Sequence, residues 1–285
     1  MRARPLAGLT VLVPRARDQA SDFSALLRAR GAEPLEVPTI EIRPVASTAA
    51  LDQAVEDLAA GHFDWVVLTS VNGVAALRAR FEALGQDPAA LAKARVAAVG
   101  PATETALRHW GVEPDLVPEV ATTAALAQSF PPARGANAAA PGQGVPSASR
   151  PTTAAPGQPV PAGSGEVLLA RADLANPELA VVLRDKGWRT TEVVAYHTVP
   201  VGALDPAARR RLDAGDVDWV AFTASSTVEG FLRGYGGPPP PGIRVAAIGP
   251  VTADTARAAG IRVATTATEH TIPGLVAAIE QAVTA

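Results

Sequence analysis

FDWVVLTSVNGVAALRARF at residues 63–81 and VDWVAFTASSTVEGFLRGY at residues 217–235 are two copies of one pattern. In each copy an aspartate precedes four apolar residues, a short loop of small polar residues follows, and a stretch with helical periodicity completes the block. The short apolar run is typical of a strand buried on both faces of a parallel sheet. The pattern therefore predicts the strand–loop–helix unit of an α/β domain.

Two further blocks recur in the same order. TVLVPRARDQASDFSALLRARGAEPLEVPTI (10–40) matches EVLLARADLANPELAVVLRDKGWRTTEVVAY (166–196), and ARVAAVGPATETALRHWGVEPDLVPE (94–119) matches IRVAAIGPVTADTARAAGIRVATTAT (243–268). The copies lie about 150 residues apart, a period too long for a solenoid repeat. We therefore expect a duplicated, doubly wound α/β domain. Four glycines stand where helix C-caps belong, each before a new strand: Gly31, Gly111, Gly187 and Gly260.

Composition fits two ordinary domains and excludes several classes of protein. The 285 residues are 48% hydrophobic and 19% charged, enough apolar material for real cores. A net charge of −3 argues against a nucleic-acid partner, which is held by clustered cations. The absence of cysteine excludes disulfides and thiolate sites. No apolar run is long enough to span a membrane, and the opening residues lack a cleavage signal, so we expect a cytoplasmic protein.

Residues 131–164 differ from the rest of the chain. They are rich in proline, glycine and alanine, and Arg134 and Arg150 are their only charged residues. Such a segment cannot bury enough apolar surface to offset the entropy lost on ordering. The composition predicts a flexible insert.

The loops after the expected strands are rich in hydroxyls, with a few arginines. In open parallel sheets, ligands bind outside the carboxyl ends of the strands, where helix N-termini favour anions. A hydroxyl at such a position is also an ordinary N-cap, so no single loop is decisive. Two matching sets of loops favour an anion site shared by the two domains. The residues that we single out are Arg15, Ser70, Asn72, Thr103, Arg171, Ser225, Ser226 and Thr252.

Missing motifs exclude several kinds of chemistry. The chain has no P-loop, no dinucleotide-binding glycine fingerprint and no nucleophile elbow. The four histidines are scattered without ligand spacing, so we expect no metal site and no cofactor. Asp64 and Asp218 precede strands, at the opposite end from a ligand site, and are expected to be structural turn residues.

The blocks together resemble the uroporphyrinogen-III synthase family. The resemblance rests on VLVPRARDQASDFSALLRARGAEPLEVPTIEIRP, FDWVVLTSVNGV, RVAAVGPATETAL, GWRTTEVVAYHTVP and VAAIGPVTADTARAAG, and it covers the chain outside residues 131–164. It implies two flavodoxin-like doubly wound parallel-sheet domains joined by a two-stranded connector. The implied ranges are 1–37 with 201–285 for the first domain, 45–193 for the second, and 38–44 and 194–200 for the connector strands.

The same resemblance implies an enzyme, a lyase. It would close the linear tetrapyrrole hydroxymethylbilane with inversion of ring D, giving uroporphyrinogen III and water without a metal or cofactor. The substrate carries eight carboxylates, which suits loops with many neutral donors. The resemblance also implies a monomer without nucleic-acid or membrane partners, and it allows a transient hand-over from hydroxymethylbilane synthase.

Site residues follow from the resemblance position by position. Tyr196 falls on the connector tyrosine that assists departure of hydroxide in the family, and we assign Thr252 the second catalytic role. The other loop residues named above are assigned to substrate binding. Ala224 stands where the family commonly has serine, so Ser225 or Ser226 would have to substitute. An alternative stays open, a bilobed module that binds a small anion without transforming it.

Overall fold

The computed structural model describes residues 4–133 and 165–284. The expected insert at 131–164 lies outside the described residues except for its first three. Contacts divide the chain into two compact units: Met1–Arg43 with His197–Ala285 form the first unit, and Pro44–Tyr196 form the second. The chain passes from the first unit to the second within strand β3 (Ile40–Pro44) and returns within strand β7 (Arg189–Pro200).

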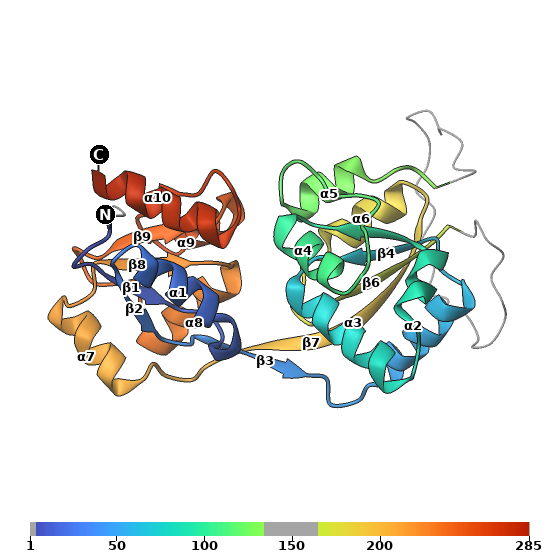
Figure 1. The fold of residues 1–285 in the computed structure, drawn as a ribbon, viewed down its shortest axis with the longest axis horizontal. Helices are drawn as coiled ribbons and strands as arrows, with labels where there is room; N and C mark the ends of the chain where they lie inside the picture. The colour runs from blue at the N-terminus through green and yellow to red at the C-terminus, as the bar shows by residue number, and fades with distance from the viewer. Residues whose placement is uncertain (1–3, 134–164, 285) are drawn as a thin grey trace, which may run out of the picture. The chain divides into compact units, whose positions relative to one another are not determined.

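The first unit is a five-stranded sheet in the order β10-β9-β8-β1-β2, with every neighbouring pair parallel. Helices cover both faces of the sheet (Figure 1). Its elements are β1 (Thr10–Val13), η1 (Arg17–Gln19), α1 (Ser21–Ala29), β2 (Glu33–Glu36), α7 (Pro206–Ala214), β8 (Trp219–Phe222), α8 (Ser225–Tyr235), β9 (Arg244–Ala247), α9 (Pro250–Ala258), β10 (Thr265–Thr266) and α10 (Ile272–Thr284).

Side-chain alternation along the central strands builds a core on each face of this sheet. Val11 and Val13 pack into a cluster with residues of α1 and α10, whereas Leu12 between them packs with residues of α7, α8 and α9. All four residues of β1 are buried. Burial on both faces explains the uninterrupted apolar runs in the sequence.

The second unit has the sheet order β3-β7-β6-β4-β5, and its β7-β6, β6-β4 and β4-β5 pairs are parallel. α5 and α6 pack together over one core cluster of this unit, and α2, α3 and α4 pack against one another in sequence. Besides β3 and β7, its elements are α2 (Ala49–Ala60), β4 (Trp65–Leu68), α3 (Val71–Ala83), η2 (Pro88–Lys93), β5 (Arg95–Ala98), α4 (Pro101–His109), α5 (Thr123–Ser129), β6 (Glu166–Ala172) and α6 (Glu178–Asp185).

The expected doubly wound α/β architecture is confirmed in both halves of the chain. The four glycines expected as C-caps all have positive φ, between 77° at Gly260 and 92° at Gly31. L-residues rarely adopt this conformation, which is why glycine ends these helices. Within the described residues, no helix has the length and hydropathy to cross a membrane.

The aspartates that precede β4 and β8 hold the starts of neighbouring strands. The Asp218 carboxylate accepts the backbone N–H of Thr10 at 2.7 Å, at the start of β1. The Asp64 carboxylate accepts the N–H groups of Gly165 and Glu166 at 2.8 and 3.2 Å, at the start of β6. Both aspartates therefore have a structural partner at the amino ends of the strands.

Candidate functional site

At the carboxyl end of β4, the neighbouring residues Ser70 and Asn72 meet Tyr196, which lies far from them in the sequence. Ser70 ends the loop after β4 and caps α3, its Oγ accepting the N–H of Gly73 at 3.0 Å. The same Oγ lies 2.9 Å from the Tyr196 hydroxyl oxygen, across 126 positions of sequence. The Asn72 side chain hydrogen-bonds this hydroxyl as well. Three of the expected site residues thus form one cluster within the second unit.

A β-bulge aims Tyr196 at this cluster. Along β6 and β7, Arg171 is paired with Val194, but the next residue, Ala172, is paired with Tyr196. One extra residue of β7, Ala195, is accommodated between the two pairs. Because side chains alternate between faces along a strand, the extra residue reverses the face that the following side chain takes. Ala195 and Tyr196 are consequently both buried.

The environment of Tyr196 keeps its phenol protonated. Burial raises the pKa of Tyr196 above its ordinary value. Hydrogen bonds from Ser70 and Asn72 lower the pKa by less, and the negative charge of Asp173 raises it further. At neutral pH the group is therefore a proton donor. Asp173 was missed by the sequence reasoning, although it follows Arg171 closely in the loop after β6.

Arg171 is already paired within its own sheet. Its guanidinium forms an ion pair with Glu192 on the adjacent strand and donates to the carbonyl of Asn176 at 2.8 Å. Only 9% of the Arg171 side chain is exposed. These contacts give Arg171 a structural role. Its expected role in binding a substrate carboxylate stays a prediction.

Replacing Arg171 with alanine is expected to lower the free energy of unfolding by about 2 kcal/mol. The change leaves Glu192 without its partner, and the usual cost of breaking a buried pair is reduced because that glutamate is partly exposed. Arg189→Ala is the matched control, because Arg189 pairs with Glu166 across the same two strands but is 62% exposed. Urea denaturation should show a loss below about 1 kcal/mol for that control. Equal losses in the two variants would contradict the prediction.

Thr103 and Thr252 occupy matching positions in the first turns of α4 and α9. Each helix begins with proline after a glycine, and both threonines are buried. Packing requires glycine at position 100, since a Cβ there would lie 2.5 Å from that of Ala121, whereas a Cβ on Gly249 would lie 3.1 Å from the His270 ring. The two Gly-Pro loops thus let the starts of α4 and α9 lie close to neighbouring segments of the same chain. The roles of Thr103 and Thr252 in catalysis or binding stay predictions.

In the first unit the loop after β8 lacks the contacts made by Ser70. Ala224 is the N-cap residue of α8 and offers no side-chain cap, and the Thr227 hydroxyl instead accepts the N–H of Ala224 and donates to its carbonyl. Ser225 lies 2.7 Å from Thr255, hydroxyl to hydroxyl. Arg15 donates to the side chain of Gln19 at 3.3 Å. Ser226 lies in the first turn of α8, partly exposed.

The duplication is therefore unequal where the chemistry is expected. Aligning the repeats places Ala224 opposite Ser70 and Ile40 opposite Tyr196. An alanine and an isoleucine cannot form the hydroxyl pair of the second unit. The paired phenol and serine hydroxyls occur in one copy of the repeat and not in the other.

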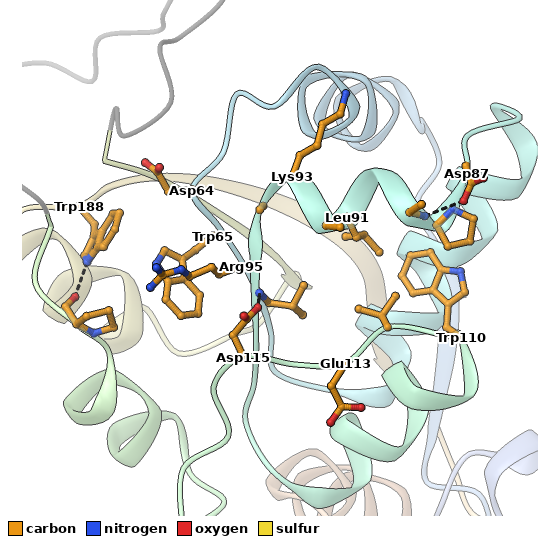
Figure 2. A pocket seen from close by; sticks show the side chains of 18 of the residues that line it. Asp64, Trp65, Asp87, Leu91, Lys93, Arg95, Trp110, Glu113, Asp115 and Trp188 are labelled. Carbon is orange, nitrogen blue, oxygen red and sulfur yellow. Dashed lines mark hydrogen bonds between the residues drawn. The ribbon is translucent and has the colours of Figure 1, made fainter.

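A cavity of the second unit lies at the other end of its sheet (Figure 2). Its volume is about 930 Å³, and it is lined by residues at the starts of β4 and β5, among them Trp65 and Arg95. The Arg95 guanidinium stacks over the Trp65 ring, 5.6 Å from its centroid. None of the expected site residues lines this cavity. Ligands of parallel sheets bind at the carboxyl ends, so we do not assign the cavity to the reaction.

Solved structures define the class of protein first. A mutant uroporphyrinogen III synthase from the extremely thermophilic bacterium Thermus thermophilus matches 97% of this chain and 99% of its own, with a TM-score of 0.63 and 24% identity. Uroporphyrinogen-III synthetase from Helicobacter pylori matches 94% of this chain and 97% of its own, with a TM-score of 0.52 and 15% identity. At these identities the likeness establishes the fold, a two-domain α/β protein.

Sequence comparison then gives the family. The family model described as uroporphyrinogen-III synthase HemD matches residues 21–143 and 157–277. A uroporphyrinogen-III synthase from Synechococcus elongatus is 31% identical over 99% of this chain and 98% of its own. A porphyrin biosynthesis protein HemD from Ruminiclostridium josui is 26% identical over 91% of this chain, which spans 46% of that longer protein. The chain belongs to the uroporphyrinogen-III synthase family.

Proposed function

We propose that this protein cyclises hydroxymethylbilane, inverts ring D, and releases uroporphyrinogen III and water. The observation that carries the proposal is the buried, protonated Tyr196 held against Ser70 at the carboxyl end of β4. Loss of the terminal hydroxyl of the linear substrate is the first step, and a hydroxyl leaves more readily when a proton donor assists it. Tyr196 is the donor in this proposal.

The steps after water loss need orientation more than further proton transfer. Departure of the hydroxyl leaves an azafulvene, which ring D attacks through its substituted carbon to form a spiro intermediate. The intermediate fragments and recloses with ring D inverted. Unassisted closure instead gives the type I isomer, so the protein must hold the chain in the conformation that leads to inversion.

Substrate carboxylates would be held by loop donors at the helix starts. Thr103 in the second unit and Ser225, Ser226 and Thr252 in the first lie in the first turns of their helices, where N–H groups and the helix dipole favour anions. Arg15 is a better candidate than Arg171 for a direct ion pair, because the Arg171 guanidinium is nearly buried against Glu192. We assign Thr252 the second catalytic role within the same proposal.

We infer a cytoplasmic monomer that takes the reactive bilane by transient hand-over from hydroxymethylbilane synthase. Family membership favours this enzyme over the alternative of an anion-binding module without catalysis.

An isomer assay tests the proposed function. Purified protein is incubated with freshly made hydroxymethylbilane, the products are oxidised to uroporphyrins, and the type I and type III isomers are separated. We expect type III to predominate, with type I alone in a parallel incubation with heat-denatured protein. Type I as the sole product with folded protein would refute the proposal.

A further inference from the structure

The surroundings of Ser70 favour one orientation of its hydroxyl hydrogen. Its Oγ accepts the Gly73 N–H at 3.0 Å and lies at the N-terminus of α3, where the free N–H groups present partial positive charge. The distance alone lets either hydroxyl donate, but this positive charge favours the orientation in which the lone pairs of Oγ face the helix and its hydrogen points away. The atom in that direction is the Tyr196 hydroxyl oxygen, at 2.9 Å.

Asn72 supplies the second hydrogen bond to the same oxygen. It lies in the first turn of α3, two residues after Ser70, and its side chain reaches the Tyr196 hydroxyl. A phenol oxygen can accept hydrogen bonds and donate one proton. When Ser70 and Asn72 both donate to it, the phenolic proton has no acceptor among these two residues and must point elsewhere.

We propose that Ser70 and Asn72 are positioning residues that donate to the Tyr196 oxygen and so direct its proton toward the departing hydroxyl of the substrate. The inference rests on the proposed function and deepens it. Hydrogen bonds donated to a hydroxyl also polarise it and strengthen its own donation. Ser70 thus acts through Tyr196, whereas the sequence alone led us to expect that it would bind a substrate carboxylate.

The surrounding packing holds the three groups in place. A Cβ added to Gly73 would lie 3.0 Å from the Ala170 carbonyl oxygen, so the start of α3 packs directly on β6. The bulge at Ala195 sets Tyr196 from the other side. The matching positions of the first unit lack both hydroxyls, so this arrangement is specific to one half of the duplicated chain.

Steady-state kinetics distinguish positioning from direct binding. We expect Ser70→Ala to lower kcat about fivefold to tenfold, the effect of one hydrogen bond, with KM within twofold of wild type. Ser70→Thr retains the hydroxyl and should restore most of the rate. Asp87→Ala is the matched control, because Asp87 also caps a helix of the second unit, η2, but at the amino ends of the strands. A rise in KM with unchanged kcat in Ser70→Ala would overturn the inference.

Titration of Tyr196 tests the hydrogen bonds without any substrate. The chain contains two tyrosines, so Tyr235→Phe leaves Tyr196 as the only one, and its ionisation can be followed by tyrosinate absorbance while circular dichroism monitors folding. In this background Ser70→Ala and Asn72→Ala should both move the titration to higher pH, because each removes a donor to the phenolate. Asn72→Asp should move it further, since a carboxylate accepts the proton and repels the phenolate.

A Tyr196 titration that is unchanged or moves to lower pH in these variants would overturn the inference. The inference about Ser70 and Asn72 can fail while the proposed function holds. The titration measures the ionisation of Tyr196 without substrate, whereas the isomer assay measures only the product. If Ser70→Ala does not fold, the two Asn72 variants carry the same test, since Asn72 is not the capping residue of α3.

Discussion

Replacing Tyr196 with phenylalanine is expected to lower kcat about tenfold or more while KM stays within about twofold, which is the signature of a lost proton donor. The substitution removes one oxygen atom and leaves the buried ring in place. Spontaneous closure of the bilane continues, so the share of type I isomer should rise as the enzymatic rate falls. Stopped or short-time assays with both isomers quantified would measure the two effects together.

The pH dependence of kcat in the wild-type enzyme is a second test of Tyr196 as the proton donor. Because the pKa of Tyr196 is raised, the phenol stays protonated through neutral pH and loses its proton only above the usual tyrosine range of about 10. Wild-type kcat should therefore show no loss from this group at neutral pH and should fall on the alkaline side. Tyr196→Phe should lack that alkaline fall.

Tyr235→Phe is the control for this prediction. Tyr235 is the other tyrosine of the chain, and it donates to Asp213 on the exposed surface of the first unit. Its replacement should leave kcat unchanged. A Tyr196→Phe enzyme with a kcat within twofold of wild type would remove Tyr196 from the mechanism.

Sequence reasoning predicted the strands well because each is buried on both faces. The runs at Trp65–Leu68 and Trp219–Phe222 have no polar residue to interrupt them, and all eight positions are buried. Strand β7 (Arg189–Pro200) was harder to predict, because only Val193, Ala195 and Tyr196 among its twelve residues are buried and the strand continues from one unit into the other. Its bulge at Ala195 leaves no mark in the residue types.

In the candidate site too, the sequence predicts local features but not the contacts between residues that are distant along the chain. Ser70 could be singled out as a hydroxyl at a helix start, since capping is a local property. Its partner Tyr196 lies in another strand, and only the tertiary fold determines that the two oxygens meet. The pairing of Arg171 with Glu192 depends likewise on the register of β6 and β7, which no local pattern specifies.

Phe130→Ala is expected to be the most destabilising of the substitutions considered, lowering the free energy of unfolding by about 4 kcal/mol. The Phe130 ring is 1% exposed and lies between two tryptophans, with centroids 4.6 Å from Trp65 and 5.8 Å from Trp188. Truncation removes both aromatic contacts and leaves a cavity at the starts of β4 and β7.

This packing joins chain segments on the two sides of residues 134–164. Phe130 follows α5, and the Trp188 indole donates to the carbonyl of Pro131 at 2.7 Å. A Cβ on Gly165 would lie 3.9 Å from that of Ala133, so the described ends of the two segments also meet. The aromatic cluster of Trp65, Phe130 and Trp188 therefore ties the start of β7 to the first half of the unit.

Urea denaturation followed by tryptophan fluorescence measures the effect, since Trp65 and Trp188 both contact the truncated ring. Phe130→Leu, which retains most of the volume, should cost less than about 2 kcal/mol and serves as the matched control. Because the cluster lies at the amino ends of the strands and Tyr196 at the carboxyl end of β4, the folded Phe130→Ala protein should keep its kcat at low temperature. A loss of stability below about 1 kcal/mol would show that the ring contributes little to holding the second unit together.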